Sequence, residues 1–251
     1  TAFGKCLGPP CGFNNGLGNK TNDSEPPVLT INNPLDGAIY NSRVVLINLS
    51  VNEKSDIYYL DLINGRGRYT SVCTNCFGYD RTRSFGEGLN KLQFRAKDVI
   101  GNTAYKNVSF FVDSSKPRIL RTEPGRGFTN GDFSIEFRED NPTNLYITYG
   151  DTNPGFNVHE VNISEECELD NNEKYYCDTH IDLSAYDGHK IQYWVNITDI
   201  ANNRVDSGKI NGPDVDTTLP VINSLTHTID KKYVKFKVNI TEENFEEAPY
   251  S

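Results

Sequence analysis

The chain has 251 residues, with 25 Lys and Arg against 34 Asp and Glu, which gives a formal net charge of -9. This acidity argues against a nucleic-acid partner, because binding to a phosphate backbone depends on clustered Lys and Arg. No run of about 18 apolar residues occurs, so the sequence predicts no membrane span in this segment. A chain of this length has room for two domains of about 100 residues with further pieces at the ends.

One boundary phrase occurs three times along the chain. It reads DSEPPVL from Asp23, DSSKPRI from Asp113 and DTTLPVI from Asp216, so its starts are 90 and 103 residues apart. A fixed phrase at this spacing indicates a tandem array. Each repeat has the length of one small sandwich domain.

These phrases predict four parts of the chain. They are residues 1–22, a Cys- and Gly-rich segment or the end of a preceding domain; residues 23–113, the first domain; residues 114–216, the second; and residues 217–251, the start of a third. The third is expected to be incomplete or to be completed by another chain, because Val234–Ser251 aligns with only Phe133–Gly150 of the second. We also expect the chain to be a piece of a longer precursor.

Strand alternation dominates the sequence, whereas helical periodicity is almost missing. In chain order, the alternating apolar positions begin with Val45, Ile47, Leu49 and Val51, then Leu92, Phe94 and Ala96, then Val108, Phe110 and Val112, and continue with Ile135 and Phe137, with Ile191, Tyr193, Val195 and Ile197, and with Val234, Phe236, Val238 and Ile240. Turn sequences such as NGRGR and DNNEK separate them. The predicted fold class is all-β, with tandem immunoglobulin-like β-sandwich modules.

The six cysteines fall into three local pairs: Cys6 and Cys11, Cys73 and Cys76, Cys167 and Cys177. An even count in local pairs predicts three short-loop disulfides in an oxidising, extracellular compartment. A zinc site or a redox motif at Cys73-Thr-Asn-Cys76 is an alternative. Neither has much support, because no His lies near that pair and its flanks have no helical period.

The sequence contains seven Asn-x-Ser/Thr acceptor motifs for N-linked glycans, at Asn19, Asn22, Asn48, Asn107, Asn162, Asn196 and Asn239. The last five lie next to inward apolar residues, so strand alternation predicts that they point outward. We expect the set to be glycosylated, while ordinary surface Asn remains the alternative for any single motif.

Acid-rich turns suggest calcium, which takes six to eight oxygen ligands. The candidate ligands at the junctions of the repeats are Asp98 with Asp113, Asp199 with Asp216, and the nearby carboxylates Glu139 and Asp140. The simpler interpretation stays open, in which these Asp side chains cap their own turns. We expect no other cofactor.

Catalysis finds little support in the sequence. It has no nucleophile elbow, zincin helix or phosphate loop, and its four His residues are scattered at His159, His180, His189 and His227. The single Trp, Trp194, lies on the outward parity of its predicted strand. It is expected to hold a ligand such as a sugar, or to be covered by a loop or a neighbouring module.

The first repeat resembles the immunoglobulin-like repeats of archaeal and bacterial cell-surface proteins, most closely the archaeal ones. The resemblance rests on PPVLTINNPLDGAIYNSRVVLINLSV, GLNKLQFRAKDVIGN and FFVDSSKPRI, with KIQYWVNITDIANN in the second repeat. It implies a non-enzymatic structural module of an extracellular, glycosylated cell-surface or filament-forming protein, that is, a stalk, surface layer or fibre subunit. An adhesin or carbohydrate-binding surface module is the alternative. The implied partners are N-linked glycans and neighbouring copies or other surface proteins.

Overall fold

A computed structural model describes residues 23–153 and 155–242 of the chain. Within these residues the protein is all-β apart from one helical turn, α1 (Ile163–Glu166), and one 3-10 turn, η1 (Ser184–Tyr186). The chain divides into two compact units near Asp113. Among the described residues, no helix is long and apolar enough to cross a membrane.

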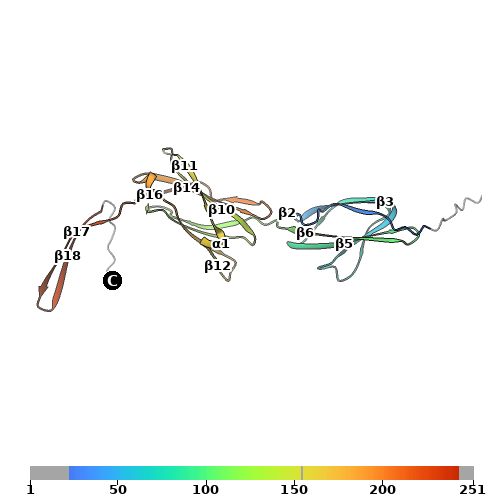
Figure 1. Ribbon diagram of the computed structural model, residues 1–251, viewed down its shortest axis with the longest axis horizontal. Helices are drawn as coiled ribbons and strands as arrows, with labels where there is room; N and C mark the ends of the chain where they lie inside the picture. The colour runs from blue at the N-terminus through green and yellow to red at the C-terminus, as the bar shows by residue number, and fades with distance from the viewer. Residues whose placement is uncertain (1–22, 154, 243–251) are drawn as a thin grey trace, which may run out of the picture. The chain divides into compact units, whose positions relative to one another are not determined.

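Six strands form one hydrogen-bonded sheet with the order β1-β3-β5-β6-β2, and with β4 paired to β3. Figure 1 labels β2, β3, β5 and β6 of this sheet; all six strands except β2, which the division groups with the second unit, belong to the first unit. Their bounds are β1 (Leu29–Asn33), β2 (Ile39–Tyr40), β3 (Val44–Asp61), β4 (Thr70–Ser84), β5 (Gly88–Asp98) and β6 (Thr103–Val112).

Strand β3 takes part in pairings on both sides of the first unit. Its first half pairs with β1, Leu29 lying opposite Val51, and its second half pairs with β5, Ile57 lying opposite Ala96. The register with β4 shifts between Ser50 and Ser55. The sequence predicts two separate sheets, whereas in this unit one long strand belongs to both halves and joins them into a single bonded network.

The second unit is a two-sheet sandwich. One sheet has the order β11-β10-β14-β16-β8 with β15 paired to β14, and the other has the order β12-β13-β9-β7. Their bounds are β7 (Arg118–Glu123), β8 (Phe128–Thr129), β9 (Asp132–Arg138), β10 (Pro142–Gly150), β11 (Phe156–Val161), β12 (Cys167–Leu169), β13 (Tyr175–His180), β14 (Lys190–Asp199), β15 (Arg204–Asp206) and β16 (Ile210–Val215).

Alternating residues of the two sheets form the core of the second unit. Phe133 and Phe137 of β9, Ile147 of β10, and Tyr193 and Val195 of β14 are fully buried. The rings of Phe133 and Tyr193 meet edge to face at 5.2 Å, which brings one sheet into contact with the other. Burial of this alternate face stabilises the unit because apolar area is removed from water.

A third set of strands forms a hairpin of β17 (Val221–Asp230) and β18 (Tyr233–Thr241). Within the described residues these strands pair only with each other. Every residue of both strands is exposed, and Leu225 and Phe236 are 63% and 68% exposed.

The core of the second unit can be tested with one buried and one exposed phenylalanine. Substituting Phe137→Ala is expected to lower the free energy of unfolding by about 3–5 kcal/mol, because Phe137 is fully buried between the sheets. Substituting Phe128→Ala, which removes a side chain that is 47% exposed, should change it by no more than about 0.5 kcal/mol. Urea unfolding of both variants measures the difference, and equal effects would contradict this core.

Candidate functional site

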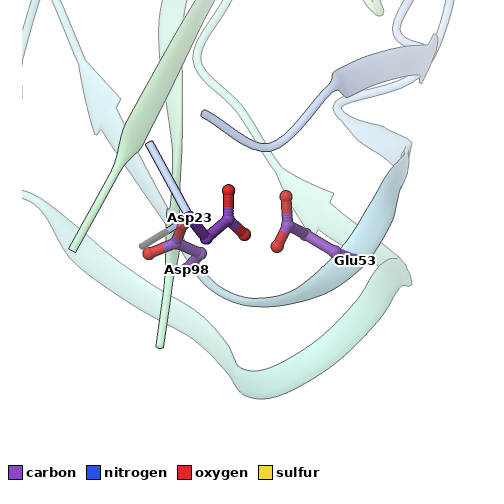
Figure 2. A group of neighbouring side chains, drawn as sticks. All are labelled: Asp23, Glu53 and Asp98. Carbon is purple, nitrogen blue, oxygen red and sulfur yellow. The ribbon is translucent and has the colours of Figure 1, made fainter. Parts of the chain in front are cut away.

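Two groups of three carboxylates are the main candidate site of the protein, one in each compact unit. Their members are Asp23, Glu53 and Asp98 in the first unit and Asp113, Glu139 and Asp199 in the second. In each group the carboxylate oxygens lie within 4.8 Å of one another. Figure 2 shows the first group, in which the three side chains come from separate segments and approach a common space.

The two groups are built from equivalent positions. The first member is the Asp that opens the boundary phrase of its unit, and the third member is the last residue of β5 or β14. The second member is a Glu placed two residues after a buried core residue, Glu53 after Val51 and Glu139 after Phe137. Because side chains in a strand alternate between faces, both Glu side chains continue the inward row.

The third member of each group caps its own turn. Asp98 Oδ1 accepts the backbone N–H of Ile100 and of Asn102, each at 2.9 Å. Burial alone would raise the pKa of Asp98, but these hydrogen bonds, with those from Gly101 and from the Asn102 side chain, outweigh it and hold the pKa below its usual value. Asp98 is therefore charged at neutral pH.

Asp199 repeats this arrangement in the second unit. Its Oδ1 accepts the backbone N–H of Ala201 and of Asn203, each at 2.8 Å. Asp98 and Asp199 therefore both cap their own turns, which is the simpler interpretation that the sequence left open. Both are also members of a carboxylate group, so capping does not exclude metal binding.

The same geometry in both units links each turn to the start of its unit. The Asn102 side-chain Nδ2 donates to Asp98 Oδ2 at 2.8 Å and to the carbonyl oxygens of Asp23 and Glu25 at 3.0 and 3.2 Å. These bonds join the turn after β5 to the segment before β1, and so they hold Asp23 beside Asp98.

In the second unit, Asn203 makes the same contacts. Its Nδ2 donates to Asp199 Oδ2 at 2.8 Å and to the carbonyl oxygens of Asp113 and Ser115 at 2.8 and 3.2 Å. We call the arrangement of Asp98 with Asn102, and of Asp199 with Asn203, the junction lock. It occurs twice, about 100 residues apart.

The second group is more deeply buried than the first. Asp113, Glu139 and Asp199 are 5%, 7% and 1% exposed. Burial, partly opposed by the N–H of Asn141, raises the pKa of Glu139, and the negative charges of Asp113 and Asp199 raise it further. The pKa of Glu53 is raised for the same reasons, first by burial and then by Asp23 and Asp98.

The donor set indicates which metal these groups would suit. All three ligand side chains are carboxylates, which prefer hard cations such as Ca²⁺, Mg²⁺ and Mn²⁺. Ca²⁺ binds oxygen at about 2.3–2.6 Å, so two oxygens on opposite sides of one ion are separated by about 5 Å. The spacing of up to 4.8 Å in both groups therefore fits ligands of one calcium ion.

The groups of acidic residues within each unit differ from the pairs expected from the sequence. Asp98 was expected with Asp113, and Asp199 with Asp216, but each lies instead with the Asp that opens its own unit. Glu139 belongs to the second group, whereas the exposed Asp140 does not.

Glu53 and Asp23 were missed as ligands, although the sequence contains a signal for them. A Glu on the inward parity of an apolar strand is unexpected unless it has a partner or a ligand. In β18 the same row, Val234, Phe236, Val238 and Ile240, is followed by Glu242. Asp216 and Glu242 thus hold the equivalent sequence positions in the third repeat.

The structure contains two of the three predicted disulfides. Cys73 is bonded to Cys76 within β4, and Cys167 of β12 is bonded to Cys177 of β13. Cys177 is fully buried in the core of the second unit. The predicted pair Cys6 and Cys11 lies outside the described residues.

The acceptor asparagines are placed unequally. Asn107 and Asn239 are exposed, and Asn162 is exposed at the start of α1, where its Oδ1 accepts from Ser164. Asn48 is half-buried, and its Nδ2 donates to Asp80 Oδ2 at 3.1 Å. Asn19 and Asn22 lie outside the described residues.

Asn196 lies on the outer face of its strand as expected, but it is not exposed. Its side chain is 4% exposed, and its Nδ2, the atom that would carry a glycan, donates to Asp206 Oδ2 at 3.0 Å. The alternation rule placed it correctly on the face opposite Val195. This face is covered at Asn196 by neighbouring strands, which the pattern of one strand does not reveal.

The four histidines lie outside both carboxylate groups. His159 contacts the Thr179 hydroxyl at 3.1 Å, and His180 and His189 pair with Asp132 and Asp151 at 2.7 and 2.9 Å. Hydrogen bonds from the two histidines are the first cause that lowers the pKa of these Asp residues. His227, on β17, lies 6.3 Å from the ring of Phe236.

Comparison with solved structures shows similarity to tandem β-sandwich modules. No family model and no curated protein matches the chain. A titin I-band fragment, I67–I69, is 11% identical, with a TM-score of 0.44 over 87% of this chain and 77% of that one. A tetra-tandem repeat from the extending region of a large adhesion protein is 15% identical, with a TM-score of 0.37 over 86% and 63%. The fibronectin(III)-like modules of Clostridium thermocellum CbhA are 14% identical, with a TM-score of 0.36 over 75% and 94%.

The placement of the asparagines predicts unequal glycosylation. Peptide mapping of the native protein by mass spectrometry should find glycans at Asn107 and Asn239 and none at Asn196. The Asn196 side chain is only 4% exposed, so the fold leaves no room for a glycan on its Nδ2 atom. An occupied Asn196 in folded protein would contradict the structure of β14 and β15.

Proposed function

We propose that this chain is a non-enzymatic structural segment of an extracellular, glycosylated cell-surface or filament-forming protein, such as a stalk, surface layer or fibre subunit. The junction lock is the observation that carries the proposal. Equivalent residues build it in both units, and in each it fastens the start of the unit to a turn of the same unit. Repeated fastening of this kind suits a module that is used in series.

The disulfides support this proposal. Bonds between Cys73 and Cys76 and between Cys167 and Cys177 suit an oxidising, extracellular compartment. They also restrict the unfolded chain, and on loop-closure entropy each stabilises its unit by roughly 2–3 kcal/mol. A module exposed to the outside of a cell benefits from such cross-links.

The exposed hairpin supports contacts with neighbouring copies. Apolar side chains such as Leu225 and Phe236 are exposed on β17 and β18, and both strands have an open edge within the described residues. Open strand edges accept further strands readily. Homotypic contact at this hairpin would let the modules assemble in order.

Calcium at the two carboxylate groups is part of the proposed function. Three buried negative charges in the second group repel one another, and burying them without a cation is costly. A calcium ion bound by Asp113, Glu139 and Asp199 would remove that repulsion. It would join the beginning of the unit, the end of β9 and the end of β14.

The calcium proposal predicts that Glu139→Gln stabilises the protein without calcium and destabilises it with calcium. With a chelator at pH 7, Glu139→Gln should raise the free energy of unfolding by about 1 kcal/mol, because it removes one of three mutually repelling charges. With millimolar calcium, the same variant should be less stable than the wild type, because a ligand is lost. Thermal unfolding measures both, with expected shifts of about 4–8 °C.

The pH dependence of the chelated protein gives a second measurement of the same variant. Because the folded state raises the pKa of Glu139, the folded state holds this proton more tightly than the unfolded chain does. The wild type should therefore lose stability as the pH rises from the usual pKa of Glu through the raised value, and Glu139→Gln should not show this loss. Glu136→Gln, on the same strand, is the matched control.

Equal stabilisation of wild type and Glu139→Gln by calcium would contradict the site.

The structural role is tested by electron microscopy of native surface material, with and without a calcium chelator. Regular fibres or a lattice with a repeat of a few modules are expected, with loss of order after chelation. Isolated, beaded stalks without lateral order would contradict a fibre or surface-layer subunit, and of the three proposed roles would leave only the stalk, with display or adhesion as its use.

A further inference from the structure

The only tryptophan of the chain lies on the outer face of the second unit. Trp194 of β14 is half-buried, whereas its neighbours Tyr193 and Val195 are fully buried in the core on the opposite face. Its ring lies 5.4 Å from the ring of Phe156, with an interplanar angle of 51°. Phe156 is 42% exposed, so the pair presents aromatic surface to solvent.

A glycine lets these rings meet. Phe156 of β11 lies opposite Gly150 of β10, and Gly150 lies opposite Gln192 of β14. No side chain therefore stands between Phe156 and β14 at this level. A Cβ atom on Gly150 would lie 2.1 Å from the Gly155 carbonyl oxygen, so the tight turn between the strands requires glycine.

A small hollow with polar groups adjoins the aromatic pair. It has a volume of about 260 Å³ and is lined by Phe156, Trp194, Asp206 and Lys209. The Lys209 ammonium lies 5.5 Å from the centre of the Phe156 ring. Asp206 is held in place by the Gly208 N–H at 2.7 Å and by Asn196 Nδ2 at 3.0 Å.

A buried acceptor without a partner lies on the same face. Asn196 follows Trp194 by two residues, so both side chains project from the same side of β14. Its Oδ1 is the one buried side-chain oxygen, among the described residues, that has no hydrogen-bond partner. An unpaired buried acceptor is costly, and such groups call for a specific explanation. Asn196 does not line the hollow itself, but its Nδ2 donates to Asp206, which does, so the unpaired acceptor lies beside the hollow.

We propose that the hollow beside Trp194 binds one pyranose ring of a carbohydrate. The apolar C–H face of the sugar stacks on Trp194 and Phe156, Asp206 accepts a hydrogen bond from a hydroxyl, and Lys209 donates one to another hydroxyl. This site is separate from both carboxylate groups and does not depend on calcium.

The chemistry of the lining favours a neutral sugar over other small ligands. An anion would meet Asp206 and a cation would meet Lys209, whereas hydroxyl groups can both donate and accept. The hollow is also smaller than the pockets of about 300–1,000 Å³ that hold drug-sized ligands, which suits a single ring.

Because Trp194 is the only tryptophan, its fluorescence reports directly on the site. The test uses the full chain produced without N-glycosylation, so that its own glycans do not occupy the hollow. The methyl glycosides of glucose, galactose, mannose and N-acetylglucosamine are titrated separately, and Trp emission is recorded. At least one should give a saturable change with a millimolar dissociation constant.

Variants then connect that change with the site. Asp206→Asn keeps the shape of the side chain and should weaken binding about tenfold, because a hydrogen bond to a charged acceptor is lost. Phe156→Ala should abolish saturation. Phe128→Ala, an exposed aromatic residue on β8 of the same unit, is the matched control and should leave binding unchanged. Thermal unfolding shows that each variant is folded.

Two results would overturn the proposal. One is the absence of a saturable change with all four glycosides up to their solubility limits. The other is binding of equal affinity in the wild type, Asp206→Asn and Phe156→Ala, because the sugar would then bind elsewhere. Trp194→Phe, measured by saturation-transfer NMR of the ligand, provides a readout that does not use the indole and should also show weaker binding.

Discussion

Each unit depends on a carboxylate that is hydrogen-bonded to the backbone of its own turn. Asp98 and Asp199 each end a strand, and each accepts hydrogen bonds from backbone N–H groups of the following turn. The Asn that closes the turn then reaches the carbonyl groups at the start of the unit. The first segment of each unit is thereby fastened to a strand that is distant in sequence, and the other acidic residues gather around this point.

This arrangement has an electrostatic consequence. Fastening Asp23 or Asp113 beside the turn brings a second carboxylate close, and the inward Glu53 or Glu139 adds a third. Most of a small core gains stability from apolar burial, but these positions retain negative charge that burial makes more costly. The raised pKa of Glu53 and of Glu139 expresses this cost. A hard cation would convert the same positions from a source of repulsion into a cross-link between three segments.

The outer face of the second unit forms a surface with a different chemistry. Alternation puts Trp194 and Asn196 on the same side of β14, and the sequence treats that side as solvent-facing. Side chains of neighbouring strands partly cover this side. Asp206 of β15 lies opposite Asn196, and the ring of Phe156 on β11 reaches Trp194 because its partner Gly150 has no side chain. An aromatic surface with polar groups at its edge results, distinct in position and in chemistry from the acidic groups.

The sequence by itself determined the all-β class, most inward positions of the strands in the two units, and the cysteine pairs Cys73–Cys76 and Cys167–Cys177, because strand period and short-range spacing are properties of neighbouring residues. Tertiary structure alone decided which carboxylates meet. Asp98 groups with Asp23, which is distant in sequence, because antiparallel strands return the chain to the start of the same unit. It also decided that Asn196 is buried, since burial depends on side chains from strands that the local pattern does not describe.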